Sequence, residues 1–337
     1  MHTSRTRTIG RLRAAADLLR PRTLFRTLAR VDSVVDDVRV LKSQVDQLKI
    51  RIEQLATIER VNWQQPIDNA RLDASRIARH VEDAVRAESV EMEPFPHVLV
   101  SDWLPSDVYD ILIRAVPPPV FFADREERRQ QLTVPFDLAP AFSQHVWRFV
   151  SKEVIGGALC RALNDAFKPA IRTYVSTFCP ELPHDVDLKL SASDGRILLR
   201  RPGYVIEPHR DPKWGFLTGL IYLALKGDNE SYGTQLYRVR EDVEAPSGKP
   251  YYIDSHRCEL AKTIPFRPNT LLVFLNSGGA HGASIPADAV PADLIRLVYQ
   301  FRLGPSYHTM QQLLSHMSPE KRAAWGGSKV DRASKYD

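Results

Sequence analysis

The second half of the chain constrains the fold most, because after Pro180 it breaks into about eight short segments rich in β-forming residues. Gly, Pro, Asn and Asp separate these segments. Many short strands at regular spacing predict a double-sheet jelly roll or a barrel. The expected strands are Asp187–Ser191, Arg196–Arg201, Leu217–Leu225, Thr234–Val239, Tyr251–Ile253, Leu260–Pro265, Leu271–Leu275 and Leu294–Leu303.

Helical patterns precede the strands. Apolar residues recur at intervals of three and four over residues 138–150 and 151–178, and a shorter helix is expected to end near Arg114. The 337 residues are 43% hydrophobic and 26% charged, which suits a globular protein with a sizeable core. We therefore predict an α+β protein: a double-stranded β-helix, or jelly roll, with helices that buttress one face.

A heptad pattern occupies residues 31–58. Apolar residues alternate in steps of three and four, with β-branched residues at a and mainly Leu at d, which favours a parallel two-stranded coiled coil. Asp37 at g would then face Lys42 at e of the second chain. This pattern predicts a homodimer through residues 31–58; the alternative is an amphipathic helix that lies on its own domain. The a and d positions are Val31, Val34, Val38, Leu41, Val45, Leu48, Ile52 and Leu55.

The positive charge is concentrated at the N-terminus. Residues 1–30 contain eight Arg and one acidic residue, Asp17, a net charge of +7, so the overall +5 leaves −2 for the rest of the chain. A neutral body does not predict a nucleic-acid partner. The basic tail fits a solvated arm, a segment that contacts an anionic membrane surface, or an organellar transit peptide.

Cysteine usage bears on the cellular compartment. The chain has three cysteines, an odd number, and no C-x-x-C motif, which favours reduced thiols. We therefore expect a cytoplasmic protein, with peripheral membrane contact as an option through the basic tail.

Three polar side chains in the β-rich half suggest a metal site. The pair H-x-[DE] occurs twice, but His80 lies on an expected helix, where positions i and i+2 point apart. His209 and Asp211 lie on an extended segment, where both share a face. His281 follows a buried apolar strand and enters a glycine turn. Two imidazoles and one carboxylate bind Fe(II) while leaving coordination positions open.

These segments, in this order, resemble the Fe(II)/2-oxoglutarate-dependent oxygenases, specifically the prolyl-4-hydroxylase-like group. The resemblance covers about residues 93–304. It rests on Pro94-Phe-Pro-His-Val, Trp103-Leu-Pro, Pro202-Gly203, Pro208-His209-x-Asp211, Leu220-Ile-Tyr-Leu223, Gly233-Thr-Gln-Leu-Tyr237, Pro268-Asn-Thr-Leu-Leu-Val-Phe274 and His281-Gly282, with Arg296 opening the last strand.

The resemblance implies roles for five residues. His209, Asp211 and His281 would bind Fe(II), Arg296 would pair with the distal carboxylate of 2-oxoglutarate, and Tyr222 would help to hold that carboxylate. The implied reaction uses O₂, with ascorbate as reductant, and couples decarboxylation of 2-oxoglutarate to hydroxylation of a peptidyl side chain, a glycan or a small metabolite. The resulting segments are a basic tail (1–30), a coiled coil (31–58), a helical linker (59–92), the oxygenase domain (93–305) and a C-terminal helix and tail (306–337).

Several alternatives remain open from the sequence. Arg302 is a second candidate for the 2-oxoglutarate anchor. Arg196, Arg200 and Arg201 fit either an anionic substrate or a solvated strand edge. The fold also hosts cupin-like metal proteins without oxidative chemistry, and a coiled-coil scaffold with a ligand-binding jelly roll is a third class.

Overall fold

One long helix, α2 (Pro21–Gln64), carries the heptad pattern. Its a and d side chains from Val34 to Leu55 are between 48% and 67% exposed. The helix therefore has an exposed apolar stripe. It also extends past both ends of the predicted coiled coil, which was expected to span residues 31–58. The basic tail lies outside the residues whose side chains the structure describes.

The computed structural model describes residues 21–64, 72–122, 129–133, 136, 138–212, 215–240, 251–276 and 278–326. The chain divides into two units, Met1–Thr57 and Ile58–Asp337. Among the described residues, no helix is both long and apolar enough to cross a membrane.

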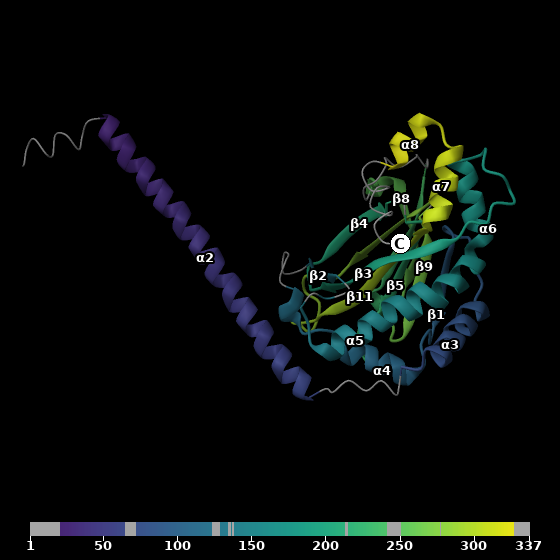
Figure 1. Cartoon of the computed structure of the whole chain (residues 1–337), viewed down its shortest axis with the longest axis horizontal. Helices are drawn as coiled ribbons and strands as arrows, with labels where there is room; N and C mark the ends of the chain where they lie inside the picture. Colours follow the sequence, from purple (N-terminus) through teal and green to yellow (C-terminus); the bar gives the residue numbers. More distant parts are fainter. Residues whose placement is uncertain are drawn as a thin grey trace, which may run out of the picture. The chain divides into compact units, whose positions relative to one another are not determined.

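Two antiparallel sheets form the centre of the second unit (Figure 1). Within the described residues the large sheet has six strands and the small sheet has five. The large sheet runs β1 (His97–Ser101), β9 (Thr270–Leu275), β5 (Leu217–Tyr222), β11 (Arg296–Pro305), β3 (Leu190–Arg200) and β2 (Arg129–Thr133). The small sheet runs β7 (Tyr251–Tyr252), β4 (Val205–Arg210), β10 (Ala280–Ser284), β6 (Thr234–Val239) and β8 (Cys258–Ile264).

The chain passes back and forth between the two sheets. Strands β3, β5, β9 and β11 lie in the large sheet, whereas β4, β6, β8 and β10 lie in the small one. This is the connectivity of a double-sheet jelly roll, which confirms the predicted fold.

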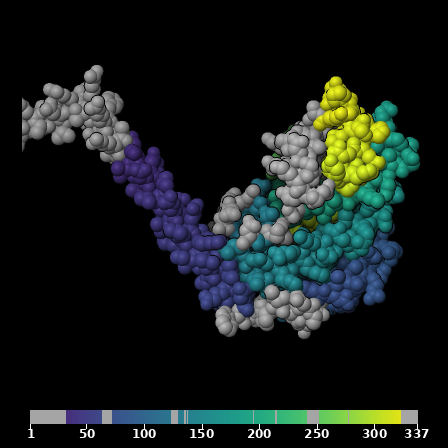
Figure 2. Space-filling view, viewed as in Figure 1, coloured from purple at the N-terminus to yellow at the C-terminus, as the bar shows by residue number. Residues whose placement is uncertain are grey.

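Helices cover the outer face of the large sheet. They are α3 (Ala74–Ala87), α4 (Ser106–Arg114), α5 (Ala141–Phe149), η3 (Val150–Leu159) and α6 (Cys160–Phe178). One apolar cluster joins them to the sheet, with Trp147 of α5 against Tyr299 of β11 at 4.9 Å between ring centroids. In the space-filling view, these helices and the yellow α7 (Tyr307–His316) and α8 (Pro319–Gly326) form much of the visible face (Figure 2). The predicted buttressing helices are thus confirmed.

Some element boundaries differ from the prediction. Residues 141–178 are helical throughout, because a π-helical segment, η3, joins the two helices expected there. The two strands expected over residues 187–201 are one strand, β3. Strands β2 and β10 were not predicted, since their sequences, Arg-Gln-Gln-Leu-Thr and Ala-His-Gly-Ala-Ser, lack the apolar alternation of an independent strand.

Candidate metal centre

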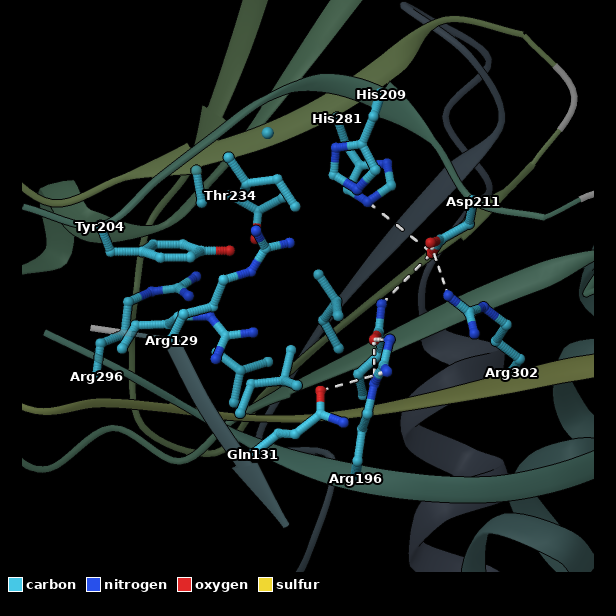
Figure 3. Close-up of a pocket in the computed structure, with 18 of the residues that line it drawn as sticks. Arg129, Gln131, Arg196, Tyr204, His209, Asp211, Thr234, His281, Arg296 and Arg302 are labelled. Carbon is cyan, nitrogen blue, oxygen red and sulfur yellow. Dashed lines mark hydrogen bonds and ion pairs between the residues drawn. The ribbon is translucent and has the colours of Figure 1, made fainter. Parts of the chain in front are cut away.

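The three predicted metal ligands converge between the two sheets. His209 lies near the end of β4, Asp211 follows that strand, and His281 on β10 pairs directly with His209 in the β-ladder. The two imidazole centroids are 4.2 Å apart. One ligand atom from each of the three residues lies within 4.8 Å of the others (Figure 3).

Gly282 allows the two ligand-bearing strands to approach each other. A Cβ atom at this position would lie 2.8 Å from the carbonyl oxygen of Ile206 on β4, closer than real Cβ contacts allow. The glycine after His281 therefore permits the strand pairing that places His281 opposite His209.

Electrostatics favour the protonation states that a metal needs. Burial lowers the pKa of His281 to about 3, and burial also lowers the pKa of His209, so both imidazoles are neutral at physiological pH. Burial would raise the pKa of Asp211, but the charge of Arg302, together with the hydrogen bond from Thr218, lowers that pKa. His209 Nδ1 lies 2.9 Å from the carbonyl oxygen of Glu207, which favours the tautomer that leaves the Nε2 lone pair for a metal.

A set of donors fixes the Asp211 carboxylate. Thr218 Oγ1 donates to Oδ2 at 2.7 Å, Gln300 Nε2 donates to Oδ2 at 3.4 Å, and Arg302 Nη2 donates to Oδ1 at 2.7 Å. Asn276 Nδ2 in turn donates to Thr218 Oγ1 at 3.0 Å. The sequence analysis kept Arg302 as a second candidate for the co-substrate anchor. Its position does not favour that role, because its guanidinium forms an ion pair with the metal ligand Asp211.

Sequence reasoning did not identify Thr218 or Gln300 and found no role for Asn276. Thr218 and Gln300 act through strand register: Gln300 is four residues beyond Arg296 on β11, and Thr218 pairs with Arg302 across β5 and β11. The sequence held one usable signal: positions 296 and 300 lie on the same face of an expected strand, which could have pointed to Gln300.

A cavity of about 240 Å³ opens beside the triad. Arg296 lines it and is only 5% exposed. Its Nε atom has no hydrogen-bond partner among the described residues, and no carboxylate of those residues pairs with it. The guanidinium is packed against the rings of Tyr222 and Phe266, at 5.7 and 5.0 Å from their centroids. A buried cation with an unsatisfied donor indicates a missing anionic ligand.

Tyr222 is fully buried and is not among the residues that line the cavity. Its hydroxyl donates to Thr234 Oγ1 at 2.8 Å, and Thr234 does line the cavity. The Tyr222 ring therefore packs against the guanidinium of Arg296. Its hydroxyl could act on the co-substrate only indirectly, through its hydrogen bond to Thr234.

The donor set fits a mononuclear Fe(II) site. Two neutral imidazoles and one ionised carboxylate on neighbouring strands form the 2-His-1-carboxylate set, which leaves positions open for further ligands. The hydrogen bonds to Asp211 and His209 supply the outer-sphere support that such ligands require.

Comparisons with known proteins found similarity among solved structures only. No family profile and no curated protein sequence matches the chain. Among solved structures, it is similar to a Pseudomonas putida prolyl-4-hydroxylase (12% identity, 68% of this chain and 99% of that one, TM-score 0.38). It is also similar to HygX from Streptomyces hygroscopicus with nickel and 2-oxoglutarate bound (12%, 62% and 82%, TM-score 0.40). A third is the viral collagen prolyl hydroxylase of Paramecium Bursaria Chlorella virus-1 (14%, 61% and 94%, TM-score 0.35).

The predicted resemblance is to the same kind of protein as these structures. The chain is similar in structure to Fe(II)/2-oxoglutarate oxygenases, among them prolyl hydroxylases, at low sequence identity, and it has the His-x-Asp…His triad.

Replacing Thr218 should weaken metal binding without a change of charge. In Thr218→Val the Asp211 carboxylate loses its shortest neutral hydrogen bond, and Asn276 loses an acceptor. We expect affinity for Fe(II) to fall about 10-fold, since outer-sphere partners of metal ligands contribute about 10- to 100-fold. Anaerobic Fe(II) titration measures this. Thr270→Val is the matched control, because Thr270 is also buried but donates to Pro268 O at 3.1 Å, away from the site. Equal Fe(II) affinities in the two variants would contradict the role of Thr218.

Proposed function

We propose that the chain is an Fe(II)- and 2-oxoglutarate-dependent dioxygenase that hydroxylates a C–H bond of its substrate. One observation carries the proposal: a metal triad and a buried arginine without a carboxylate partner among the described residues face the same cavity. Arg296 supplies the fixed positive charge that the distal carboxylate of 2-oxoglutarate needs.

Fe(II) bound by His209, Asp211 and His281 would supply the redox chemistry of O₂. In the balanced reaction, 2-oxoglutarate loses CO₂ and gains one oxygen atom to become succinate, and the second oxygen atom enters the substrate C–H bond as a hydroxyl group. The protein binds and orients the reactants. The lining of the cavity also includes the apolar side chains of Leu198, Leu220 and Val298.

Co-substrate turnover tests the proposal directly. The full-length protein is incubated in air with Fe(II), ascorbate and 2-oxoglutarate, and succinate and CO₂ are measured. We expect both products in a 1:1 ratio, at a low uncoupled rate without substrate, and no succinate when 2-oxoglutarate is omitted. A protein that binds Fe(II) tightly but forms no succinate would instead be a non-oxidative metal-binding jelly roll.

We also propose that residues 31–58 pair with a second copy of the chain. The support is the exposed apolar stripe of α2, which follows the a and d positions of one heptad register. In a parallel pair, Asp37 at g of one helix would lie near Lys42 at e of the other. The stripe is narrow, which suits one partner helix better than a domain surface.

A charge in the stripe should dissociate the pair. In the full-length protein, Leu41→Asp with Leu48→Asp buries two carboxylates per chain in the expected seam, and light scattering should show the mass fall from two chains to one. Val40→Asp is the control, because Val40 is 56% exposed at position c, outside the seam. A wild-type mass of one chain would refute the dimer.

A further inference from the structure

Tyr204 is a buried tyrosine whose hydroxyl faces the cavity beside the triad. The residue is 6% exposed and belongs to the cavity lining. Its ring extends from the wall, and its oxygen atom points toward the middle of the cavity (Figure 3). No group of the described residues forms a hydrogen bond with this hydroxyl. A buried tyrosine hydroxyl usually has a partner, so the open position indicates that a ligand supplies one.

The surroundings of the Tyr204 ring fix its position. The ring belongs to a small apolar cluster that also contains Ala283, Ile285 and Ala289. The guanidinium of Arg200 lies 4.8 Å from the ring centroid. The backbone is tied to the end of β10, because the N–H of Ile285 donates to the carbonyl oxygen of Tyr204 at 2.8 Å. The hydroxyl is therefore held in place before any ligand binds, which lowers the cost of binding one.

Arg200 places Tyr204 at the same side of the cavity as Arg296. Arg200 is 6% exposed on β3, which lies between β2 and β11, so the alternative of a solvated strand edge is wrong for this residue. It pairs directly with Arg296 across β3 and β11, while its guanidinium covers the Tyr204 ring. Tyr204 and Arg296 lie on one side of the cavity, and Asp211 lies on the other (Figure 3). Burial lowers the pKa of Arg296, and Tyr222 and Tyr204 oppose that shift, as nearby hydroxyls would.

A carboxylate bound at Arg296 has room for a further donor. Its two oxygens offer about four acceptor positions, and one guanidinium fork fills two of them. Tyr222, the donor expected from the sequence, is outside the cavity lining, and its hydroxyl already donates to another side chain. Tyr252 does line the cavity, but it pairs with the metal ligand His209, with 5.6 Å between the ring centroids. Tyr204 is therefore the lining tyrosine that lies beside Arg296.

We propose that Tyr204 donates a hydrogen bond to the distal carboxylate of 2-oxoglutarate beside Arg296, in place of the direct contact expected for Tyr222. The proposal rests on the oxygenase function and deepens it. Tyr204 directly precedes β4 of the small sheet, whereas Arg296 lies on β11 of the large sheet. The carboxylate would thus be held between the two sheets, by a cation from one and a neutral donor from the other.

Calorimetry with the full-length protein tests this assignment. Under anaerobic conditions with saturating Fe(II), 2-oxoglutarate is titrated into the wild type, Tyr204→Phe and Tyr222→Phe. Phenylalanine keeps the ring and removes only the hydroxyl. We expect Tyr204→Phe to weaken binding about 10-fold or more, because the lost hydrogen bond has a charged acceptor, and Tyr222→Phe to weaken it by a smaller factor. Affinity for Fe(II) should not change in Tyr204→Phe.

A second ligand locates the effect on the co-substrate. 2-Oxopentanoate has the same five-carbon chain as 2-oxoglutarate but lacks the distal carboxylate, so Tyr204→Phe should bind it as well as the wild type does. Tyr307→Phe is the control, because Tyr307 on α7 is exposed and outside the cavity lining. An unchanged 2-oxoglutarate affinity in Tyr204→Phe, a loss no larger than in Tyr222→Phe, or an equal loss for 2-oxopentanoate would each overturn the proposal.

Succinate formation by the wild type is measured separately, which distinguishes the two ways of failing. If the wild type forms succinate and Tyr204→Phe binds 2-oxoglutarate equally well, the role of Tyr204 is wrong and the oxygenase function stands. If the wild type binds 2-oxoglutarate but forms no succinate, the oxygenase function fails, and the binding data alone decide the role of Tyr204. A wild type that does not bind 2-oxoglutarate would overturn both.

Discussion

In His209→Ala, Fe(II) binding and succinate formation should both be lost. Among the described residues, His209 Nε2 is one of three protein donors that meet at the site, and its tautomer is set by the carbonyl of Glu207. Loss of a partner of a metal ligand already costs about 10- to 100-fold in affinity or activity, so loss of the ligand itself should exceed about 100-fold. Anaerobic Fe(II) titration measures the affinity, and succinate release measures the turnover.

The control for this variant is His184→Ala, since His184 is an exposed residue away from the cavity. It should bind Fe(II) and form succinate as the wild type does. The melting temperatures of the metal-free proteins show whether His209→Ala is folded. Succinate release at the wild-type rate by a folded His209→Ala protein would rule out the metal assignment.

Replacing Arg296 should weaken binding of 2-oxoglutarate without lowering the stability of the protein. In Arg296→Met the cavity loses the cation for the distal carboxylate of 2-oxoglutarate, and affinity for 2-oxoglutarate should fall about 100-fold or more, since two charged hydrogen bonds contribute about 3 kcal/mol together. Affinity for Fe(II) should change much less, because Arg296 does not contact the triad ligands in any described hydrogen bond or ion pair.

The same change should stabilise the protein without 2-oxoglutarate. Arg296 is 5% exposed and lies among aromatic rings, and replacing buried charges by apolar side chains is neutral or stabilising by about 1–4 kcal/mol. Calorimetric melting therefore should show an equal or higher melting temperature for Arg296→Met. Arg114→Met, at an exposed position of α4, should alter neither property. Unchanged 2-oxoglutarate affinity in Arg296→Met would contradict the anchor.

The metal triad was readable from the sequence because each ligand sits on a locally recognisable segment. The extended context of His209 distinguished it from His80, whose Nε2 instead lies 2.8 Å from the carbonyl oxygen of Asp102. The residues around the triad were not readable. Thr218 and Gln300 reach Asp211 only through the pairing of β5 with β11, and such register is set by long-range packing.

The strands that sequence reasoning missed are those that depend on neighbours. Strand β2 is polar, and it pairs along β3 from Arg129 opposite Arg200 to Thr133 opposite Arg196. Without β2, the sequence left open whether Arg196 and Arg200 lie on a solvated strand edge, and it did not predict that Arg129 lines the cavity. The π-helical segment η3 was missed for a different reason. An apolar spacing of three and four predicts a helix, but it does not show whether each backbone N–H bonds to the carbonyl four or five residues earlier.

The position of β11 has a consequence for how the site is made during synthesis. This strand is the last of the described strands, yet it lies between β3 and β5 in the large sheet and carries Arg296, Gln300 and Arg302. A nascent chain that has left the ribosome only as far as β10 already contains His209, Asp211 and His281, but it lacks the cation for the co-substrate and the closed sheet. Under the proposed function, turnover of 2-oxoglutarate should therefore begin only when translation has passed residue 302 and this strand has inserted into the large sheet.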